Sequence, residues 1–305
     1  MKPELITLNT QKSPQEFIRE CEEAYRTKIS SLVASILENA GQRPIILISG
    51  PSGSGKTTTA RLIERMLDSK GCQTHVLSLD NYFHPLTKEE KELFAQNKLD
   101  LESPERLDSE YLNYQLSELH KGKEVQIPRF DFLTNNRRNG GETLKLKKNE
   151  LIVLEGIHAH NPKVIDAEDY TMRVYVSVRT RIDLDNGHRL HPSKIRLARR
   201  MIRDIRTRGR SLENTVHLYD SVERGENLYI MPYKHRAHID IDTFFPYELC
   251  VYKNFLPANM PSAEKQYPWL TELFEVLSII PDIDPSLVPE NSLIREFIGG
   301  SIFKE

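Results

Sequence analysis

The sequence has little of several features that would indicate other classes of protein. None of its apolar runs approaches the length needed to span a membrane, and the first fifteen residues lack the apolar core of a signal peptide. The formal net charge is only −2, so the whole molecule has no electrostatic reason to bind nucleic acid or a membrane surface. We therefore expect a cytoplasmic protein without a nucleic-acid or membrane partner.

Cysteine is also scarce. Cys21, Cys72 and Cys250 lie far apart and share no disulfide or metal-ligand spacing, so we expect three free thiols in a reducing compartment. The 305 residues, 38% apolar and 28% charged, are typical of an ordinary globular protein with one large domain or two modest ones.

Five segments are predicted to be strands, and the first of them, a continuous apolar run rich in β-branched residues, is predicted to be buried. They lie at 44–49, 73–80, 151–156, 172–178 and 238–244. Helical stretches separate most of these runs. The sequence therefore predicts an α/β fold of three layers, with a mainly parallel five-stranded sheet in the middle.

The flanking regions divide the chain into three parts. Helical periodicity over 15–38 predicts a helical extension at 1–40 that packs on the main domain, 41–256. The tail at 257–305 is predicted to be a helical appendage to the same domain. Within the main domain, 81–150 is a long excursion between two core strands, with two short helices and a hairpin-like stretch, and such an insertion usually forms a binding flap.

A glycine-rich loop follows the first predicted strand. Residues 50–57 read GPSGSGKT and satisfy the pattern G-x-x-x-x-G-K-[S/T]. Glycines allow successive backbone N–H groups to point at phosphate oxygens, and the N-terminus of the following helix adds its dipole. Lys56 would neutralise the β and γ phosphates, and the Thr57 hydroxyl would ligate Mg²⁺. A flexible Gly/Ser loop is the alternative, but the strand before and the helix after favour a P-loop.

We accordingly predict a P-loop NTPase fold with ATP and Mg²⁺ as cofactors. The residues expected to contact ATP here are Gly50, Ser52, Gly53, Ser54, Gly55, Lys56, Thr57 and Thr58.

Two predicted strands end in a carboxylate, at the sheet edge where ligands gather in open α/β folds. Asp80 follows the second run, and Glu155 ends the third. Phosphoryl transfer needs a metal held and an acceptor hydroxyl oriented, so Glu155 is predicted to organise the metal and Asp80 to accept the hydroxyl proton. A turn cap at Asp80 and a cap or salt bridge at Glu155 are the alternatives.

An arginine-rich stretch, RLARRMIRDIRTRGR, spans 196–210. It could be a nucleic-acid stripe, although no aromatic residues are interleaved. It could also be a solvated salt-bridge face with Asp204 and Glu213. Because a phosphate loop lies upstream, we favour a lid at 193–215 whose guanidinium groups meet the charge on the transferred phosphoryl group.

Several segments together resemble the uridine kinase family, which is grouped with phosphoribulokinase. The resemblance rests on GPSGSGKTT, LDNYF (79–83), LESPERLD (101–108), PRFDF (128–132), LEGIHAHNP (154–162) and RRMIRDIRTRGRS (199–211). The ending PENSLIREFIGGS (289–301) is similar to a longer bacterial branch of nucleoside kinase-like proteins. In that branch a domain related to threonyl-tRNA synthetase usually precedes the kinase. Only about forty residues do so here, and we expect that domain to be missing.

The resemblance implies a role for each matching residue. Asp80 would be the base acting on a nucleoside 5′-hydroxyl, with Arg203 near the transferred phosphate. Glu102, where the family has an aspartate, would meet the ribose hydroxyls. The remaining implied contacts are Tyr82, Phe83 and Arg200 on the acceptor, and Arg208 and Arg210 on ATP.

The positions that would read the base depart from the family pattern. Phe130 stands where a tyrosine is usual, and Asn135 where the uridine and cytidine enzymes have a histidine. Both are predicted to bind the acceptor, with a core aromatic and a turn asparagine as alternatives. His158 and His160 are predicted to line the pocket or form hydrogen bonds, since Mg²⁺ favours oxygen ligands.

The leading hypothesis is an ATP-dependent kinase that phosphorylates the 5′-hydroxyl of uridine or cytidine by direct in-line transfer. A kinase of another sugar or polyol is the first alternative, and a non-catalytic nucleotide-binding regulatory protein is the second. The expected partner is a small-molecule acceptor, and a homo-oligomer is compatible with the sequence.

Overall fold

The computed structural model of this chain describes residues 1–96, 98–131, 134–138, 140–184, 187–207, 209–256 and 267–303. Within these ranges no helix is long and apolar enough to cross a membrane. All three cysteines are free thiols, as predicted.

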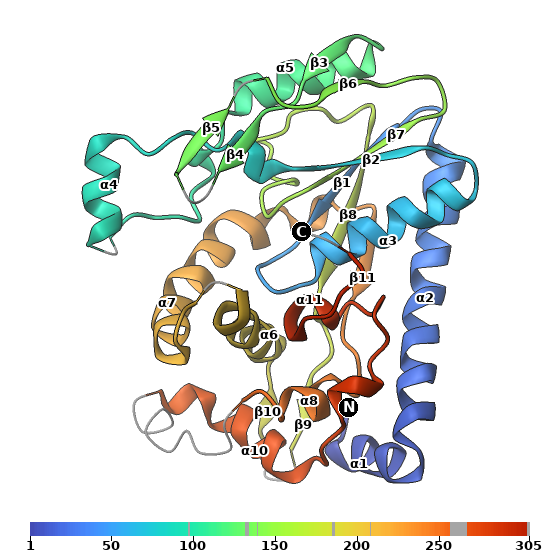
Figure 1. Ribbon diagram of the computed structural model, residues 1–305, viewed down its shortest axis with the longest axis vertical. Coiled ribbons are helices and arrows are strands. Elements are labelled where there is room, and N and C mark those ends of the chain that lie inside the picture. Colours follow the sequence, from blue (N-terminus) through green and yellow to red (C-terminus); the bar gives the residue numbers. More distant parts are fainter. Residues whose placement is uncertain are drawn as a thin grey trace.

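The centre of the molecule is a parallel sheet of five strands (Figure 1). Its spatial order is β11-β8-β1-β7-β2, and every neighbouring pair is parallel. The strands are β1 (Ile45–Ser49), β2 (Thr74–Ser78), β7 (Leu151–Glu155), β8 (Thr171–Ser177) and β11 (Ile239–Asp242). The five predicted strands and the parallel α/β fold are therefore confirmed, although β2 and β11 at the edges are only partly buried. The second run ends earlier than predicted, because Asp80 belongs to a 3₁₀ turn, η1 (Leu79–Tyr82).

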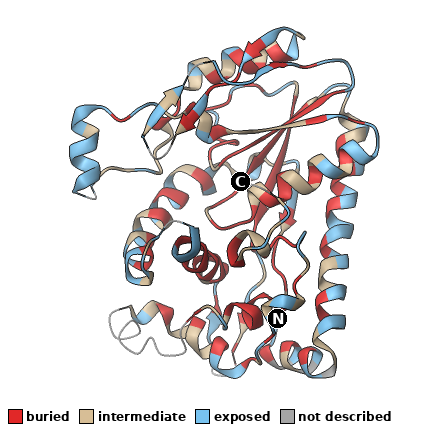
Figure 2. Cartoon of the chain, in the orientation of Figure 1, coloured by how far each residue is buried: buried red, intermediate tan, exposed pale blue. Residues whose placement is uncertain are grey.

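Side chains of the central strand alternate between two cores, one on each face of the sheet. Ile46 and Ile48 join the larger core, whereas Ile45 and Leu47 join the smaller core beneath the insertion. This alternation is the period of two that a strand imposes on its side chains. Both faces of β1 are thus covered, which explains the continuous apolar run and the buried strands of Figure 2.

The N-terminal extension consists of two helices, α1 (Pro3–Lys12) and α2 (Pro14–Asn39), of which only the second was predicted. The Ser13 hydroxyl accepts from the Glu16 backbone N–H at 3.2 Å and caps α2, with Pro14 in the first helical turn. A buried stripe from Phe17 to Ile36 packs α2 into the larger core. Its Tyr25 hydroxyl lies 2.8 Å from the Thr59 hydroxyl, so the extension contacts the helix that follows the glycine loop.

The insertion lies at one end of the molecule (Figure 1, top). It contains α4 (Lys88–Ala95), the turn η2 (Pro104–Arg106) and α5 (Ser109–His120). Its hairpin-like stretch forms two nested antiparallel pairs. The outer pair is β3 (Glu124–Gln126) with β6 (Thr143–Lys145), and the inner pair is β4 (Arg129–Asp131) with β5 (Asn136–Arg138).

The rest of the chain after β8 is mainly helical. It begins with a small hairpin of β9 (Ile182–Asp183) and β10 (Arg189–Leu190). The longer helices are α6 (Pro192–Thr207), α7 (Leu212–Gly225) and α10 (Thr271–Ile279). The shorter helices and turns are η3 (Glu226–Ile230), η4 (Met231–Arg236), α8 (Glu248–Tyr252), η5 (Pro268–Leu270), η6 (Pro285–Leu287) and α11 (Arg295–Ile298).

Helix α6, which carries most of the arginines, is part of the core. Twelve of its sixteen residues are buried. Arg199 is fully buried, and its Nε lies 2.7 Å from an oxygen of Glu248, which is also fully buried. Most of the predicted lid up to Asp204 is therefore built into the core.

Replacing Arg199 by methionine should destabilise the fold by about 3–5 kcal/mol, because Glu248 would keep a buried charge without its partner. Arg19→Met is the matched control. Its side chain is 69% exposed and pairs with Glu16 across one turn of α2, so its loss should cost about 0.5 kcal/mol or less. Urea unfolding of both variants measures the difference. Equal midpoints for the two would contradict a structural role for the buried pair.

Candidate phosphate-binding and transfer site

The glycine loop joins the central strand β1 to α3 (Lys56–Ser69). Gly55 is the N-cap residue of α3 and has a left-handed φ of 84°, which an L side chain rarely adopts. At the start of the loop, a Cβ on Gly50 would lie 1.9 Å from the Val176 carbonyl oxygen of β8. Glycine is thus required both where the loop leaves the sheet and where it enters the helix.

Side chains from outside the loop hold the loop carbonyls from behind. Arg196 Nη1 donates to Ser52 O at 3.1 Å, and Arg199 Nη1 donates to Gly53 O at 3.2 Å. The Thr243 hydroxyl donates to Ser54 O at 2.8 Å. With these carbonyls turned outward, the loop can present its N–H groups inward to an anion.

Sequence reasoning missed this bracing role of Arg196, Arg199 and Thr243. The arginine stretch gave the available signal, since residues 196 and 199 lie one helical turn apart on the same face.

Lys56 interacts with several charged groups of the site. Its Nζ donates to Pro51 O at 3.1 Å. Burial lowers the pKa of Lys56, and the carboxylates of Glu155, Glu296 and Asp80 oppose that shift. Like burial, the positive charge of Arg203 lowers the pKa of Lys56. Four charged side chains thus lie close enough to the Lys56 ammonium group to shift its pKa.

The two predicted carboxylates are brought together at the edge of the sheet. In the strand register Glu155 stands opposite Ile48 on one side and Ser78 on the other, and Asp80 follows two residues after Ser78. Burial raises the pKa of Glu155 from 4.5 to about 7, and the neighbouring charge of Asp80 adds to the rise. The Asp80 backbone N–H is capped by the Ser78 hydroxyl at 3.3 Å.

The residues present fit a magnesium ion. Glu155 is a buried carboxylate beside a second carboxylate, and this crowding of negative charge is what a divalent cation relieves. Among the described residues no group of three His, Cys, Asp or Glu could hold a metal by itself. Thr57 and Glu155 would therefore share the ion with the phosphate oxygens of a nucleotide.

Glu102 belongs to the insertion and lies against α7. A Cβ on Gly225 would meet its Cβ at 2.4 Å, so α7 approaches the Glu102 stem closely. Burial raises the pKa of Glu102, while Arg200 and Lys56 oppose the rise. The ring of His158 donates from Nε2 to Glu102 O at 2.9 Å, and burial lowers the pKa of His158 to about 4, so this ring is neutral. Both histidines make hydrogen bonds, as predicted, since His160 Nε2 lies 3.3 Å from Leu47 O.

The predicted aromatic contacts fall in different environments. Phe83 and Phe130 pack edge to face at 5.7 Å, and the Phe130 backbone N–H donates to the Asn81 side chain beside Asp80. Tyr82 instead lies in the smaller core and donates its hydroxyl to Gln115 at 2.7 Å. Asn135 has a φ of 49° between β4 and β5, the left-handed conformation that asparagine tolerates in turns.

Three further arginines gather around Asp204, which is fully buried. Arg200, Arg203 and Arg210 lie 3.5, 3.5 and 3.7 Å from its oxygens. The solvated salt-bridge interpretation is therefore wrong for Asp204. Arg200 also donates from Nη1 to the Ser52 hydroxyl at 2.8 Å, which ties the helix to the loop. Arg203 Nε is buried and makes no hydrogen bond within the described ranges, and Arg208 lies outside them.

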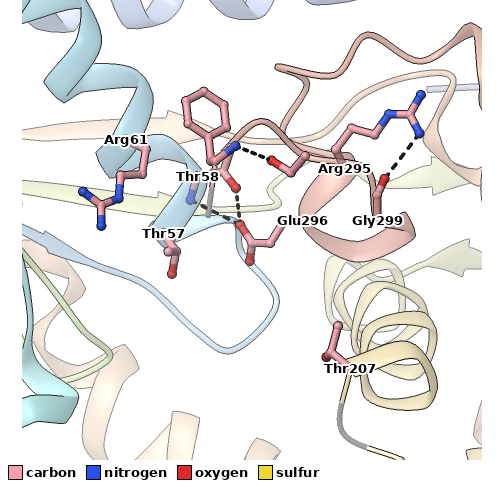
Figure 3. Close-up of a pocket in the computed structure, with 10 residues that line it drawn as sticks. Thr57, Thr58, Arg61, Thr207, Arg295, Glu296 and Gly299 are labelled. Carbon is pink, nitrogen blue, oxygen red and sulfur yellow. Dashed lines mark hydrogen bonds between the residues drawn. The ribbon is translucent and has the colours of Figure 1, made fainter. Parts of the chain in front are cut away.

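The C-terminal segment also reaches the glycine loop, which sequence reasoning missed. The Glu296 carboxylate of α11 accepts hydrogen bonds from Thr58 (Figure 3). Leu293 lies against Gly55, where an added Cβ would come within 2.5 Å of its side chain. The ending PENSLIREFIGGS was noted for its resemblance to nucleoside kinase-like proteins, but its composition does not predict that it packs on a phosphate loop.

A parallel sheet with a glycine loop after its central strand and carboxylates at the neighbouring strand ends defines a P-loop kinase fold. The model of the phosphoribulokinase / uridine kinase family matches residues 45–246. The chain belongs to this family.

Curated relatives agree. The uridine kinase of Staphylococcus haemolyticus is 32% identical over 200 residues, which are 65% of this chain and 86% of that protein. Uridine-cytidine kinase B of Dictyostelium discoideum is 31% identical over 198 residues, which are 65% of this chain and 73% of that protein. Mouse uridine-cytidine kinase-like 1 is 34% identical over 193 residues, which are 63% of this chain but only 32% of that longer protein.

Two solved structures show looser likeness. A possible uridine kinase from Bacillus stearothermophilus has a TM-score of 0.47 and 20% identity, covering 71% of this chain and 98% of that chain. D-glycerate 3-kinase from Cryptococcus neoformans has a TM-score of 0.42 and 13% identity, covering 69% and 88%. Overlaps of this degree say nothing about the acceptor.

Replacing Glu155 by glutamine should stabilise the fold at alkaline pH. The folded chain binds the Glu155 proton up to about pH 7, whereas the unfolded chain releases it near 4.5, so wild-type stability falls as the pH rises between these values. In EDTA, the Tm of Glu155→Gln should exceed that of wild type by a few degrees at pH 8, and the gain should shrink toward pH 5. Glu38→Gln, at the exposed end of α2, should show no such dependence. A gain that is the same at both pH values would contradict the assignment.

Proposed function

We propose that this protein transfers the γ-phosphoryl group of ATP to the 5′-hydroxyl of a pyrimidine nucleoside, uridine or cytidine. The observation that carries the proposal is the meeting of Lys56, Asp80 and Glu155 at the carboxyl edge of the sheet, beside the braced glycine loop. Family membership and the curated uridine kinases support the same chemistry.

The donor would bind with its phosphates against the loop. Backbone N–H groups of Gly53 to Thr58 would surround the phosphate oxygens, and the Lys56 ammonium would neutralise the β and γ phosphates. Bound beside Thr57 and Glu155, Mg²⁺ would supply charge neutralisation on the phosphates. Arg203, with its buried Nε without a hydrogen-bond partner in the described ranges, would stabilise the charge that develops on the transferred group, and Arg210 would contact the donor from the segment after α6.

The acceptor would enter between the insertion and α7. Its hydroxyl oxygen attacks the γ phosphorus while the bond from that phosphorus to the bridging oxygen of ADP breaks, and Asp80 takes the hydroxyl proton. Glu102 and Arg200 lie close enough to influence one another electrostatically. Together they would hold the ribose hydroxyls. Phe83 and Phe130 would form an aromatic wall for the base, supported from the core by Tyr82, with Asn135 at its rim.

A sugar or polyol acceptor is the second candidate. It is favoured by Phe130, which lacks a hydroxyl that could read a base, and by the left-handed turn at Asn135, which gives that residue a structural role of its own. Assays of ADP release with uridine, cytidine, ribose, glycerate and simple polyols separate the candidates. Activity on uridine or cytidine above all others supports the first. Activity on a polyol with none on nucleosides supports the second, and ATP binding without any acceptor-dependent ADP favours a non-catalytic protein.

Asp80→Asn should reduce turnover by about 10²–10⁴-fold, because the amide cannot accept the hydroxyl proton. ADP affinity, measured by calorimetry, should stay within a few fold of wild type. Asp169→Asn is the control, since Asp169 is exposed and precedes β8 at the opposite edge of the sheet. Wild-type turnover in Asp80→Asn would reject the assignment of the base.

A further inference from the structure

The C-terminal helix α11 places a carboxylate on the first turn of the P-loop helix. Glu296 Oε2 accepts from the Thr58 hydroxyl at 2.7 Å and from the Thr58 backbone N–H at 3.3 Å (Figure 3). Thr58 is the third residue of α3. A backbone N–H in the first turn of a helix has no partner within the helix, so Glu296 occupies a donor that would otherwise be open to an anion.

This donor belongs to the phosphate site of a P-loop. The N–H groups at the start of the helix receive phosphate oxygens, and those that follow the lysine of the glycine loop lie toward the inner phosphates of the nucleotide. Glu296 also lies close enough to Lys56 to oppose the lowering of the pKa of that lysine. The carboxylate therefore stands where an inner phosphate oxygen would bind, with the same charge sign and the same hydrogen-bond acceptors.

The backbone of this segment is anchored, so it cannot leave as a unit without opening the core. Leu293, Ile294 and Phe297 are fully buried in the larger core, and Phe297 lies 5.1 Å from the guanidinium of Arg199. Glu296 itself is only half-buried and borders a cavity of about 190 Å³ lined also by Arg61 and Gly300. A rotation of the Glu296 side chain into that cavity would free Thr58 while α11 stays in place.

We propose that Glu296 competes with the donor nucleotide from within the same chain. Its carboxylate occupies the position at Thr58 where an inner phosphate oxygen would bind, and it has to rotate away when ATP or ADP binds. The C-terminal segment thereby sets the donor affinity, although it lies outside the residues matched by the family model. This inference rests on the proposed function only in that the glycine loop binds a nucleotide.

Calorimetric titration of the full chain with ADP and Mg²⁺ tests the competitor directly. Glu296→Gln keeps the size of the side chain and removes its charge, so ADP should bind about tenfold more tightly than to wild type. Glu290→Gln is the matched control, because it makes the same charge change in the same segment at an exposed position. It should bind ADP as wild type does.

Inorganic tripolyphosphate, titrated in the same way, separates competition with phosphate from contact with the nucleoside. The gain in Glu296→Gln should appear with tripolyphosphate as well as with ADP. If Glu296→Gln does not fold, Glu296→Asp keeps the charge but shortens the arm, and it should bind both ligands several fold more tightly. Unchanged or weaker ADP binding in a folded variant would overturn the proposal, and so would a gain confined to ADP.

These outcomes are distinct from failure of the proposed function. If the wild-type chain binds ADP but phosphorylates no nucleoside, the acceptor assignment fails while the competitor is still measured. If neither wild type nor any Glu296 variant binds ADP or tripolyphosphate, both the nucleotide site and its competitor are rejected.

Discussion

The structure depends on how the carbonyl groups of the glycine loop are satisfied. A loop can direct its N–H groups toward an anion only if its carbonyl oxygens point elsewhere and find donors there. Here those donors are Lys56 on Pro51, Arg196 on Ser52, Arg199 on Gly53 and Thr243 on Ser54. They come from α3, α6 and the end of β11, so the loop conformation is tied to elements far apart in the sequence.

This bracing explains the unusual burial of α6. A guanidinium that serves a loop carbonyl must lie inside the protein, and its charge then needs a partner. Arg199 has Glu248, and Arg196 has Glu226 at 2.7 Å. Farther along the helix, Asp204 gathers Arg200, Arg203 and Arg210. The arginine stretch is thus divided between the loop carbonyls and the buried carboxylate of Asp204.

Much of the fold could be predicted because the relevant physics is local. A continuous apolar run predicted the buried central strand, and the glycine pattern predicted the loop, since both signals are contained in a few neighbouring residues. The meeting of Asp80 with Glu155 also followed, because the carboxyl ends of parallel strands lie at one edge. Helix α1 was missed because its ten residues carry only a weak apolar pattern.

The partners of the loop could not be predicted in the same way. Arg199 with Glu248, Thr243 with Ser54, and Glu296 with Thr58 join residues 49, 189 and 238 positions apart. Each pair consists of common polar residues whose meeting depends on how whole helices pack. The wide burial of α6 was equally hidden, because five arginines in one helix ordinarily indicate an exposed face.

A crystal structure of the chain with Mg²⁺, a non-hydrolysable ATP analogue and uridine tests the central claim most directly. The account predicts the β-phosphate enclosed by the backbone N–H groups of Gly53 to Thr57, with the loop carbonyls still held by Arg196, Arg199 and Thr243. It also predicts the acceptor hydroxyl within hydrogen-bond distance of the Asp80 carboxylate. A nucleotide bound away from the loop, or an acceptor hydroxyl turned away from Asp80, would contradict it.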